Sequence, residues 1–227
     1  MKLSFTDLGT IDYQKAWDYQ KEIFNTVWRD KEYNSKNSEQ KRETTHHLIF
    51  CEHPHVYTLG KSGAESNLLI NDQFLKKVNA TYYKTDRGGD ITYHGPGQIV
   101  GYPIFNLEEL NIGLKEYIYQ LEEVVIDTLK EYNIKSERLA KATGVWIDTD
   151  KPNARKICAI GVKASRYISM HGFALNVNTN LSYFDYINPC GFTDKLVTSM
   201  EKELNGKVAQ NEVSSLLLKN IERVFKL

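Results

Sequence analysis

The sequence is short of several features, and each shortage excludes a class of protein. Lys and Arg together number 29 and so do Asp and Glu, which leaves no net charge to attract nucleic acid along the whole chain. No apolar run approaches the roughly 18 residues that cross a membrane, and the opening residues MKLSFTDLGTIDYQ lack the apolar core of a signal peptide. Three cysteines are few and odd in number, which favours reduced thiols. We therefore expect a cytoplasmic protein that binds neither nucleic acid nor a membrane.

What is present suits a globular chain. Hydrophobic residues make up 41% and charged residues 26% of the 227 positions, a length for one large domain or two small ones. Apolar residues recur at helical spacing after Asp12, a candidate helix cap, and again over 114–129 and 213–225. Runs typical of strands lie at 47–51, after Pro54, and at 80–84, 99–102, 143–147, 157–162 and 173–177. Because the strands come in neighbouring runs rather than alternating with helices, we expect an α+β fold.

Glycine is concentrated in one stretch, residues 87–103. These seventeen residues hold five of the chain's 14 glycines and two of its 5 prolines, around Arg87, Asp90 and His94. Glycine lets a backbone approach a ligand closely, at an entropic cost that a plain connector does not need. We therefore expect an active-site loop, held in place by the strand at 99–102. The alternative is a hairpin turn with an incidental histidine.

Four histidines are candidates for chemistry. His53 and His55 flank a proline and suggest a metal site, but no cysteine or acid stands at metal-finger spacing and no second histidine pair follows. We therefore expect a turn with two surface histidines and no metal. His94 and His171 are alternative general bases, and spacing does not rank them.

The three cysteines differ in context. Cys51 and Cys158 lie in apolar strands, where a free cysteine is usually a small buried hydrophobe. Cys190 stands in a loop between a proline and a glycine, a context that leaves a thiol exposed enough to react. The alternative is an ordinary loop cysteine.

Lys156 begins the strand at 157–162. If the fold brought it beside Cys190, its ammonium would stabilise the thiolate, and in a partly dry site the amine could also accept and return a proton. The alternative is a solvated lysine at a strand end. Only the fold can bring the two residues together.

Six segments together resemble the octanoyltransferases of lipoate biosynthesis, within the superfamily of biotin and lipoate protein ligases. They follow the order of that family over most of the chain, at residues 12–17, 52–60, 87–103, 155–161, 171–176 and 189–191. The resemblance implies one catalytic domain over residues 1–227, with a mixed sheet flanked by helices.

The resemblance also implies roles for particular residues. Cys190 matches the nucleophile that carries the acyl group as a thioester, and Lys156 matches the lysine that lowers the pKa of this thiol. The residues that match the acyl pocket are Arg87, Gly88, Gly89, Asp90, Ile91, Thr92, Tyr93, His94, Ala159, Ile160, Gly161, Gly172, Phe173 and Ala174. We expect the rings of Tyr93 and Phe173 to wall the slot for the acyl chain. The implied reaction needs no metal and no cofactor, because the acyl group arrives activated as a thioester.

The implied partners are octanoyl-acyl carrier protein as donor and a lysine of lipoyl domains as acceptor, on the E2 subunits of 2-oxoacid dehydrogenases and on the glycine cleavage H protein. Two other enzymes stay open, an ATP-dependent lipoate or biotin ligase and an amidotransferase that moves acyl groups between protein lysines. A ligase needs no acyl-carrying cysteine, so the context of Cys190 disfavours it. An acyl-binding module without catalysis is the non-enzyme alternative.

Overall fold

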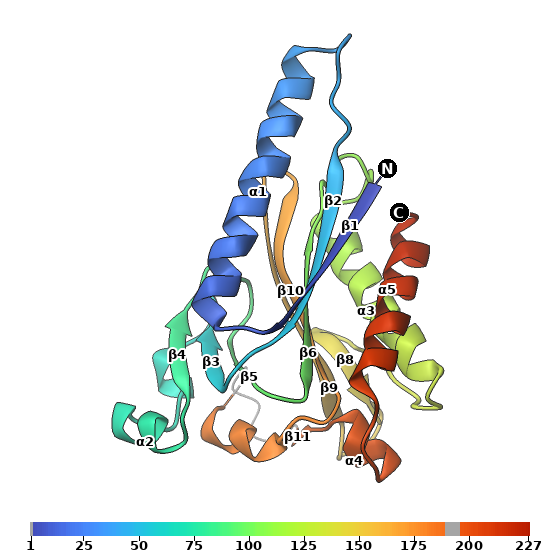
Figure 1. The fold of residues 1–227 in the computed structure, drawn as a ribbon. Coiled ribbons are helices and arrows are strands. Elements are labelled where there is room, and N and C mark those ends of the chain that lie inside the picture. The colour runs from blue at the N-terminus through green and yellow to red at the C-terminus, as the bar shows by residue number, and fades with distance from the viewer. Residues whose placement is uncertain (1, 189–195) are drawn as a thin grey trace.

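The computed structural model describes residues 2–188 and 196–227, and within them two β-sheets are flanked by helices (Figure 1). The larger sheet is mixed and contains, in spatial order, β1 (Lys2–Thr10), β2 (Thr45–Glu52), β6 (Gln98–Ile104), β10 (Ile168–Asn176), β9 (Arg155–Ser165), β8 (Ala142–Ile147) and β7 (Glu137–Leu139), with the short β11 (Leu196–Val197) paired to β9. The smaller sheet contains β4 (Thr81–Lys84), β3 (Val56–Leu59) and β5 (Ile91–His94). This arrangement confirms the predicted α+β class.

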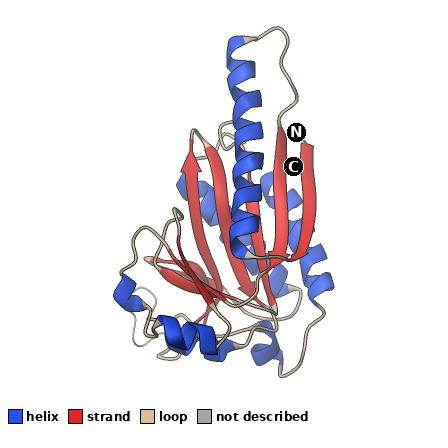
Figure 2. Cartoon of the chain, turned by 60° about the vertical axis from the view of Figure 1, so that its left-hand side comes forward, coloured by secondary structure: helices blue, strands red, loops and turns tan. Residues whose placement is uncertain are grey.

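The long helix α1 (Tyr13–Lys36) lies along one face of the larger sheet (Figure 2). It begins after Asp12, whose side chain accepts a hydrogen bond from the Lys15 amide at 3.2 Å and so caps the first turn, as predicted. Its buried residues, which follow helical spacing, are Tyr13, Ala16, Gln20, Ile23 and Val27. Among them, Ala16, Ile23 and Val27 pack on the strands of this face beside Val100 and Ala174.

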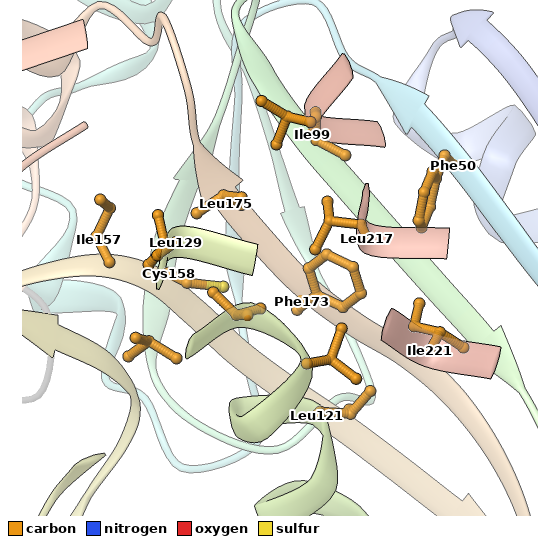
Figure 3. Packing of buried hydrophobic residues seen from close by; sticks show 14 of the residues in the cluster. Phe50, Ile99, Leu121, Leu129, Ile157, Cys158, Phe173, Leu175, Leu217 and Ile221 are labelled. Atoms are coloured by element: carbon orange, nitrogen blue, oxygen red, sulfur yellow. The ribbon is translucent and has the colours of Figure 1, made fainter. Parts of the chain in front are cut away.

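The opposite face of the larger sheet is covered by α3 (Leu114–Lys130) and α5 (Gln210–Phe225), both close to their predicted bounds. Figure 3 shows Leu121 and Leu129 of α3 and Leu217 and Ile221 of α5 around Phe173 of β10. Each such buried side chain contributes roughly 1.5–3 kcal/mol of transfer free energy. This core fixes the larger sheet against α3 and α5 and leaves the opposite face to α1 and the smaller sheet.

The remaining elements are short. They are η1 (Glu65–Asn67), α2 (Asp72–Lys77), η2 (Leu181–Tyr186) and α4 (Met200–Leu204). Besides the packing under α1 and under α3 and α5, a third apolar cluster, which includes Tyr57, Tyr93 and Leu75, joins the smaller sheet to α2 and η2. Within the described ranges, no helix is long and apolar enough to cross a membrane.

Candidate active site

A cavity of about 400 Å³ lies where the smaller sheet meets the face of the larger one. Its floor consists of matched positions on three adjacent strands. Gln98 of β6 pairs with Asn176 of β10, and two residues further along Val100 pairs with Ala174, which pairs in turn with Ala159 of β9. Side chains two apart on a strand share a face, so these pairs form successive layers of one floor.

The next layer of the floor is made of glycine. Gly172 pairs with Gly161, and a Cβ on Gly172 would overlap the Gly101 carbonyl oxygen of the neighbouring strand. A Cβ on Gly161 would lie 3.0 Å from the Gly88 carbonyl oxygen and 3.2 Å from the Arg87 side chain. Both positions therefore need glycine for close approach of another backbone, rather than for a turn.

The glycine stretch forms the roof. Arg87 is buried and donates hydrogen bonds to the Thr58 carbonyl at 2.5 Å and to the Thr58 hydroxyl at 2.9 Å. Asp90 accepts from the Asn67 side-chain amide at 2.7 Å, and the Asn67 carbonyl accepts from the Asn188 amide at 2.8 Å. The roof is thus tied to the last residue before the segment 189–195.

His94 is the start of a buried chain of amide hydrogen bonds. Its Nδ1 lies 2.8 Å from Gln98 Oε1, Gln98 Nε2 donates to Asn176 Oδ1 at 2.8 Å, and Asn176 donates to the Thr198 carbonyl at 3.0 Å. Because the Gln98 oxygen faces the ring, His94 Nδ1 is the donor of this pair. Burial lowers the pKa of His94 to about 3, so the ring is neutral at pH 7.

His171, the other candidate base, has a left-handed backbone with φ of 57°. Its amide donates to Gln20 Oε1 at 3.0 Å, and its Nε2 lies 2.8 Å from a carboxylate oxygen of Asp86, which also binds Lys163 at 2.5 Å. Burial lowers the pKa of His171, against the opposing effect of the Asp86 carboxylate. Both histidines line the cavity as neutral rings.

Lys156 lines the other end of the cavity. Its ammonium lies 4.6 Å from the centre of the Trp146 ring, and its carbonyl accepts from the Thr198 amide at 2.9 Å. The register also pairs it with Val197 of β11, the first strand after the segment that carries Cys190. Cys190 itself lies outside the described residues.

Thirteen of the predicted site residues line this one cavity, although they come from three distant segments. They are Arg87, Gly89, Asp90, Ile91, Thr92, His94, Lys156, Ala159, Ile160, Gly161, Gly172, Phe173 and Ala174. Gly88 is outside the lining and donates its amide to the Val162 carbonyl at 2.8 Å. Tyr93 is outside it as well.

Tyr93 and Phe173 were expected to wall the slot with their rings. Phe173 borders the cavity, but its ring, like that of Tyr93, packs in an apolar cluster. Tyr93 packs into the third apolar cluster, stacked on Tyr183 with ring centres 5.0 Å apart. The Phe173 ring lies in the core under α3 and α5, 6.1 Å from the Phe50 ring (Figure 3). Phe173 alternates with Ala174 along its strand, so its side chain points to the opposite face of the sheet.

The lining also includes residues that the sequence did not single out, among them Tyr13, Gln98, Val100, Tyr102, Trp146 and Asn176. Three of them alternate along β6, so a period of two in that strand would have placed them on one face. No such pattern in the sequence marks Tyr13, the first residue of α1, as a residue of the cavity.

His53 corrects an expectation, because it is fully buried rather than on the surface. Its Nδ1 donates to the Ile11 carbonyl at 2.7 Å, and its Nε2 accepts from the Tyr102 hydroxyl at 2.8 Å. The segment before α1 folds over the ring and supplies the carbonyl partner. His55 is half-buried against the Tyr183 ring.

Cys51 and Cys158 are buried free thiols, as predicted. Burial raises the pKa of each, so neither is available as a thiolate. Among residues 2–188 and 196–227, no three His, Cys, Asp or Glu side chains are grouped so as to hold a metal ion.

The fold and this cavity define a class of protein. The family model described as the lipoyl protein ligase A/B catalytic domain matches residues 12–222, and the chain belongs to that family. A solved bi-partite lipoate protein ligase from Thermoplasma acidophilum shares the fold with a TM-score of 0.72 at 12% identity, covering 100% of this chain and 84% of that one.

Curated relatives narrow the class. The chain is 54% identical over 217 residues to the octanoyltransferase of Bacteroides thetaiotaomicron, which covers 96% of this chain and 92% of that protein. It is 52% identical over 223 residues to the octanoyltransferase of Cytophaga hutchinsonii, with coverage of 97% and 91%. Both similarities extend over nearly the whole length, and they make the chain an acyltransferase of the octanoyltransferase kind.

Proposed function

We propose that this chain transfers an octanoyl group from octanoyl-acyl carrier protein to a lysine of a lipoyl domain, through a thioester on Cys190. One observation carries the proposal. Phe184 and Leu196, which stand on either side of the segment 189–195 in the sequence, both line the cavity that Lys156 also lines. The relatives named octanoyltransferase support the acyl group, and the family match over residues 12–222 supports a single catalytic domain over 1–227.

The first half-reaction forms the acyl-enzyme. The Cys190 thiolate attacks the thioester carbonyl of the donor, a carbon–sulfur bond to Cys190 forms, and the bond to the carrier's sulfur breaks. The proton that the Cys190 thiol gave to the Lys156 amine passes to the departing carrier thiolate. One thioester replaces another, so this step is nearly balanced in free energy.

The second half-reaction releases the product. The acceptor lysine attacks as its neutral amine, an amide forms, and the Cys190 sulfur leaves as the thiolate. The excess proton of the new amide nitrogen returns to the thiolate through Lys156. An amide is more stable than a thioester, so this step drives the sequence forward, and the two half-reactions predict ping-pong kinetics.

The cavity suits the acyl chain. Its floor at Val100, Ala174 and Ala159 is small and apolar, which leaves room for methylenes above the strands. The tetrahedral oxyanion in each step needs preorganised donors, and we assign that role to backbone amides near Cys190 or in the glycine stretch.

Intact mass spectrometry tests the proposal. We expect incubation with octanoyl-acyl carrier protein to add one octanoyl group to the wild-type protein, on a peptide that contains Cys190, and no octanoyl group to Cys190→Ala. The matched control is Cys51→Ala, which should acylate like the wild type because this thiol is buried. A Cys190→Ala protein that still octanoylates a lipoyl domain at the wild-type rate would refute the nucleophile.

Two turnover assays distinguish the proposed transferase from the alternative enzymes. Turnover of octanoyl-acyl carrier protein without ATP distinguishes the transferase from a ligase. Octanoyl bound to a protein lysine, offered in place of the carrier, distinguishes it from an amidotransferase.

A further inference from the structure

Three consecutive residues, 86–88, cross strands β9 and β10 beside the cavity, and Arg87 among them lines it. The Gly88 amide donates to the Val162 carbonyl of β9 at 2.8 Å. The Asp86 carboxylate binds Lys163 of β9 at 2.5 Å through one oxygen and His171 of β10 at 2.8 Å through the other. These three bonds attach the segment to both strands just beyond the glycine layer of the floor.

Arg87 lies between these two anchored residues and lines the cavity beside Gly161. An added Cβ on Gly161 would lie only 3.2 Å from Arg87 Cδ and Nη1, so the arginine rests directly on the floor there. Its guanidinium is fixed from above by the Thr58 carbonyl and hydroxyl. Arg87 thus stands over the floor at Gly161, while Lys156 lies five positions earlier on the same strand, and both residues line the cavity.

The distance between these ends is on the scale of a medium acyl chain. Gly161 is five positions after Lys156 on β9, which spans at most about 16 Å at roughly 3.3 Å per residue, because the register with β8 is irregular beside Lys156. An extended acyl chain advances about 1.25 Å per carbon, because C–C bonds are about 1.5 Å long, so eight carbons take about 9 Å. These eight carbons include the reacting carbonyl, so the remaining length is available to the Lys156 side chain. Each further carbon moves the chain end toward Arg87.

We propose that Asp86 is a positioning residue for acyl-length selection: by binding Lys163 and His171 together, it holds Arg87 against Gly161 as the end wall of the slot. The inference rests on the proposed function, since it takes the slot to be the acyl site.

Several features of Asp86 suit such an anchor. The carboxylate has two oxygens, and each is used by a different strand. The hydrogen bond from His171 and the nearby Lys163 ammonium hold the pKa of Asp86 well below its ordinary value, so the anchor stays charged at neutral pH. In the proposed half-reactions Lys156 carries the proton, and neither Lys163 nor His171 is assigned a step. The anchor therefore affects the reaction only through the position of the wall.

The test is the acyl-length profile of Asp86→Asn. An asparagine has no negative charge and only one acceptor oxygen, so the ion pair with Lys163 is lost and the two partners no longer each have an oxygen of their own. We expect kcat/KM with the twelve-carbon donor, relative to the eight-carbon donor, to rise about tenfold, the scale on which pockets discriminate methylenes. The donors are acyl-carrier thioesters of six, eight, ten and twelve carbons. The matched control is Asp127→Asn, which removes an ion pair with Arg223 between α3 and α5 and should keep the wild-type profile.

Two results would overturn the inference: an unchanged length profile in a folded Asp86→Asn, or an equal loss of kcat/KM at every length. Lys163→Met removes one of the two anchoring bonds and serves as the second variant if Asp86→Asn does not fold. Binding of the matching free fatty acids, measured by calorimetry, reports slot length without chemistry. A wild type that transfers no octanoyl group but binds octanoic acid best would reject the proposed function and leave the inference standing.

Discussion

Lys156 is the residue on which the proposed proton transfers depend. Its ammonium lies over the Trp146 ring at 4.6 Å, and its backbone is fixed to Thr198 and to Val197 of β11. The electrostatic attraction of an indole face holds a cation in place. Lys156 is therefore kept at the cavity end where β11, the first strand after residues 189–195 in the sequence, pairs with β9.

We expect Lys156→Ala to raise the apparent pKa of the reactive thiol by about one unit or more, because a positive charge within a few ångströms shifts a pKa by that amount. The rate of alkylation by iodoacetamide, followed against pH, measures the change. Lys163→Ala is the matched control, since that lysine is on the same strand but bound to Asp86. An alkylation profile that Lys156→Ala leaves unchanged would remove Lys156 from the proposed role.

At the scale of elements, the site depends on how closely three strands approach one another. β6, β10 and β9 meet at glycines, where the Gly172 Cα faces the Gly101 carbonyl without room for a methyl group. On the other face of β10, the side chains of Phe173 and Leu175 anchor the strand in the core beneath α3 and α5 (Figure 3). The strand cannot shift away from the crowding without losing that packing.

Gly172→Ala should therefore destabilise the fold by about 2 kcal/mol, within the range for overpacked interiors. The urea midpoint, with the slope of the transition, measures the change. Gly206→Ala is the control, because a Cβ there meets no atom within 4 Å, and it should leave the midpoint nearly unchanged. Equal stability of the two variants would contradict the close approach of the strands.

At the scale of the whole molecule, the histidines make stability depend on pH. All six have a lowered pKa, in each case chiefly because burial disfavours the charged ring. Burial lowers the pKa of His94 from its ordinary 6.5 to about 3, so between these values the unfolded chain binds a proton that the folded chain does not. The stability that the neutral His94 ring contributes is therefore fully present above pH 6.5 and is lost as the pH falls toward 3.

We expect the free energy of unfolding to fall between pH 7 and pH 5, with about 2 kcal/mol of the loss due to His94 alone. Urea titrations at both values test this, and His94→Gln should lose about that much less than the wild type over the same interval. His55→Gln is the comparison, because its ring is only half-buried and its contribution is smaller. The same loss in His94→Gln as in the wild type would mean that His94 does not set the pH dependence.

Periodicity and local chemistry were enough to predict much of the framework. The helical spacing over 114–129 and 213–225 predicted α3 and α5, and Asp12 marked the start of α1. Short elements such as β5 and β11 were not predicted, because two to four residues carry too little pattern to distinguish a strand from a loop. The segments that resemble octanoyltransferases also indicated the right family.

Only the tertiary structure decided whether a given side chain lies in the core or in the cavity. Sequence order places Phe173 and Ala174 together, but strand pleating sends the phenylalanine into the core and leaves the alanine on the cavity floor. His53 looked like a surface residue in a turn, and the folding of the segment before α1 across it buried it. The amino-acid sequence by itself determined the long helices, several of the strands, the family and the residue types available for chemistry. Strand register and the packing of distant segments decided the shape of the cavity, because contacts such as those of Asp86 with Lys163 and His171 join positions far apart in the chain.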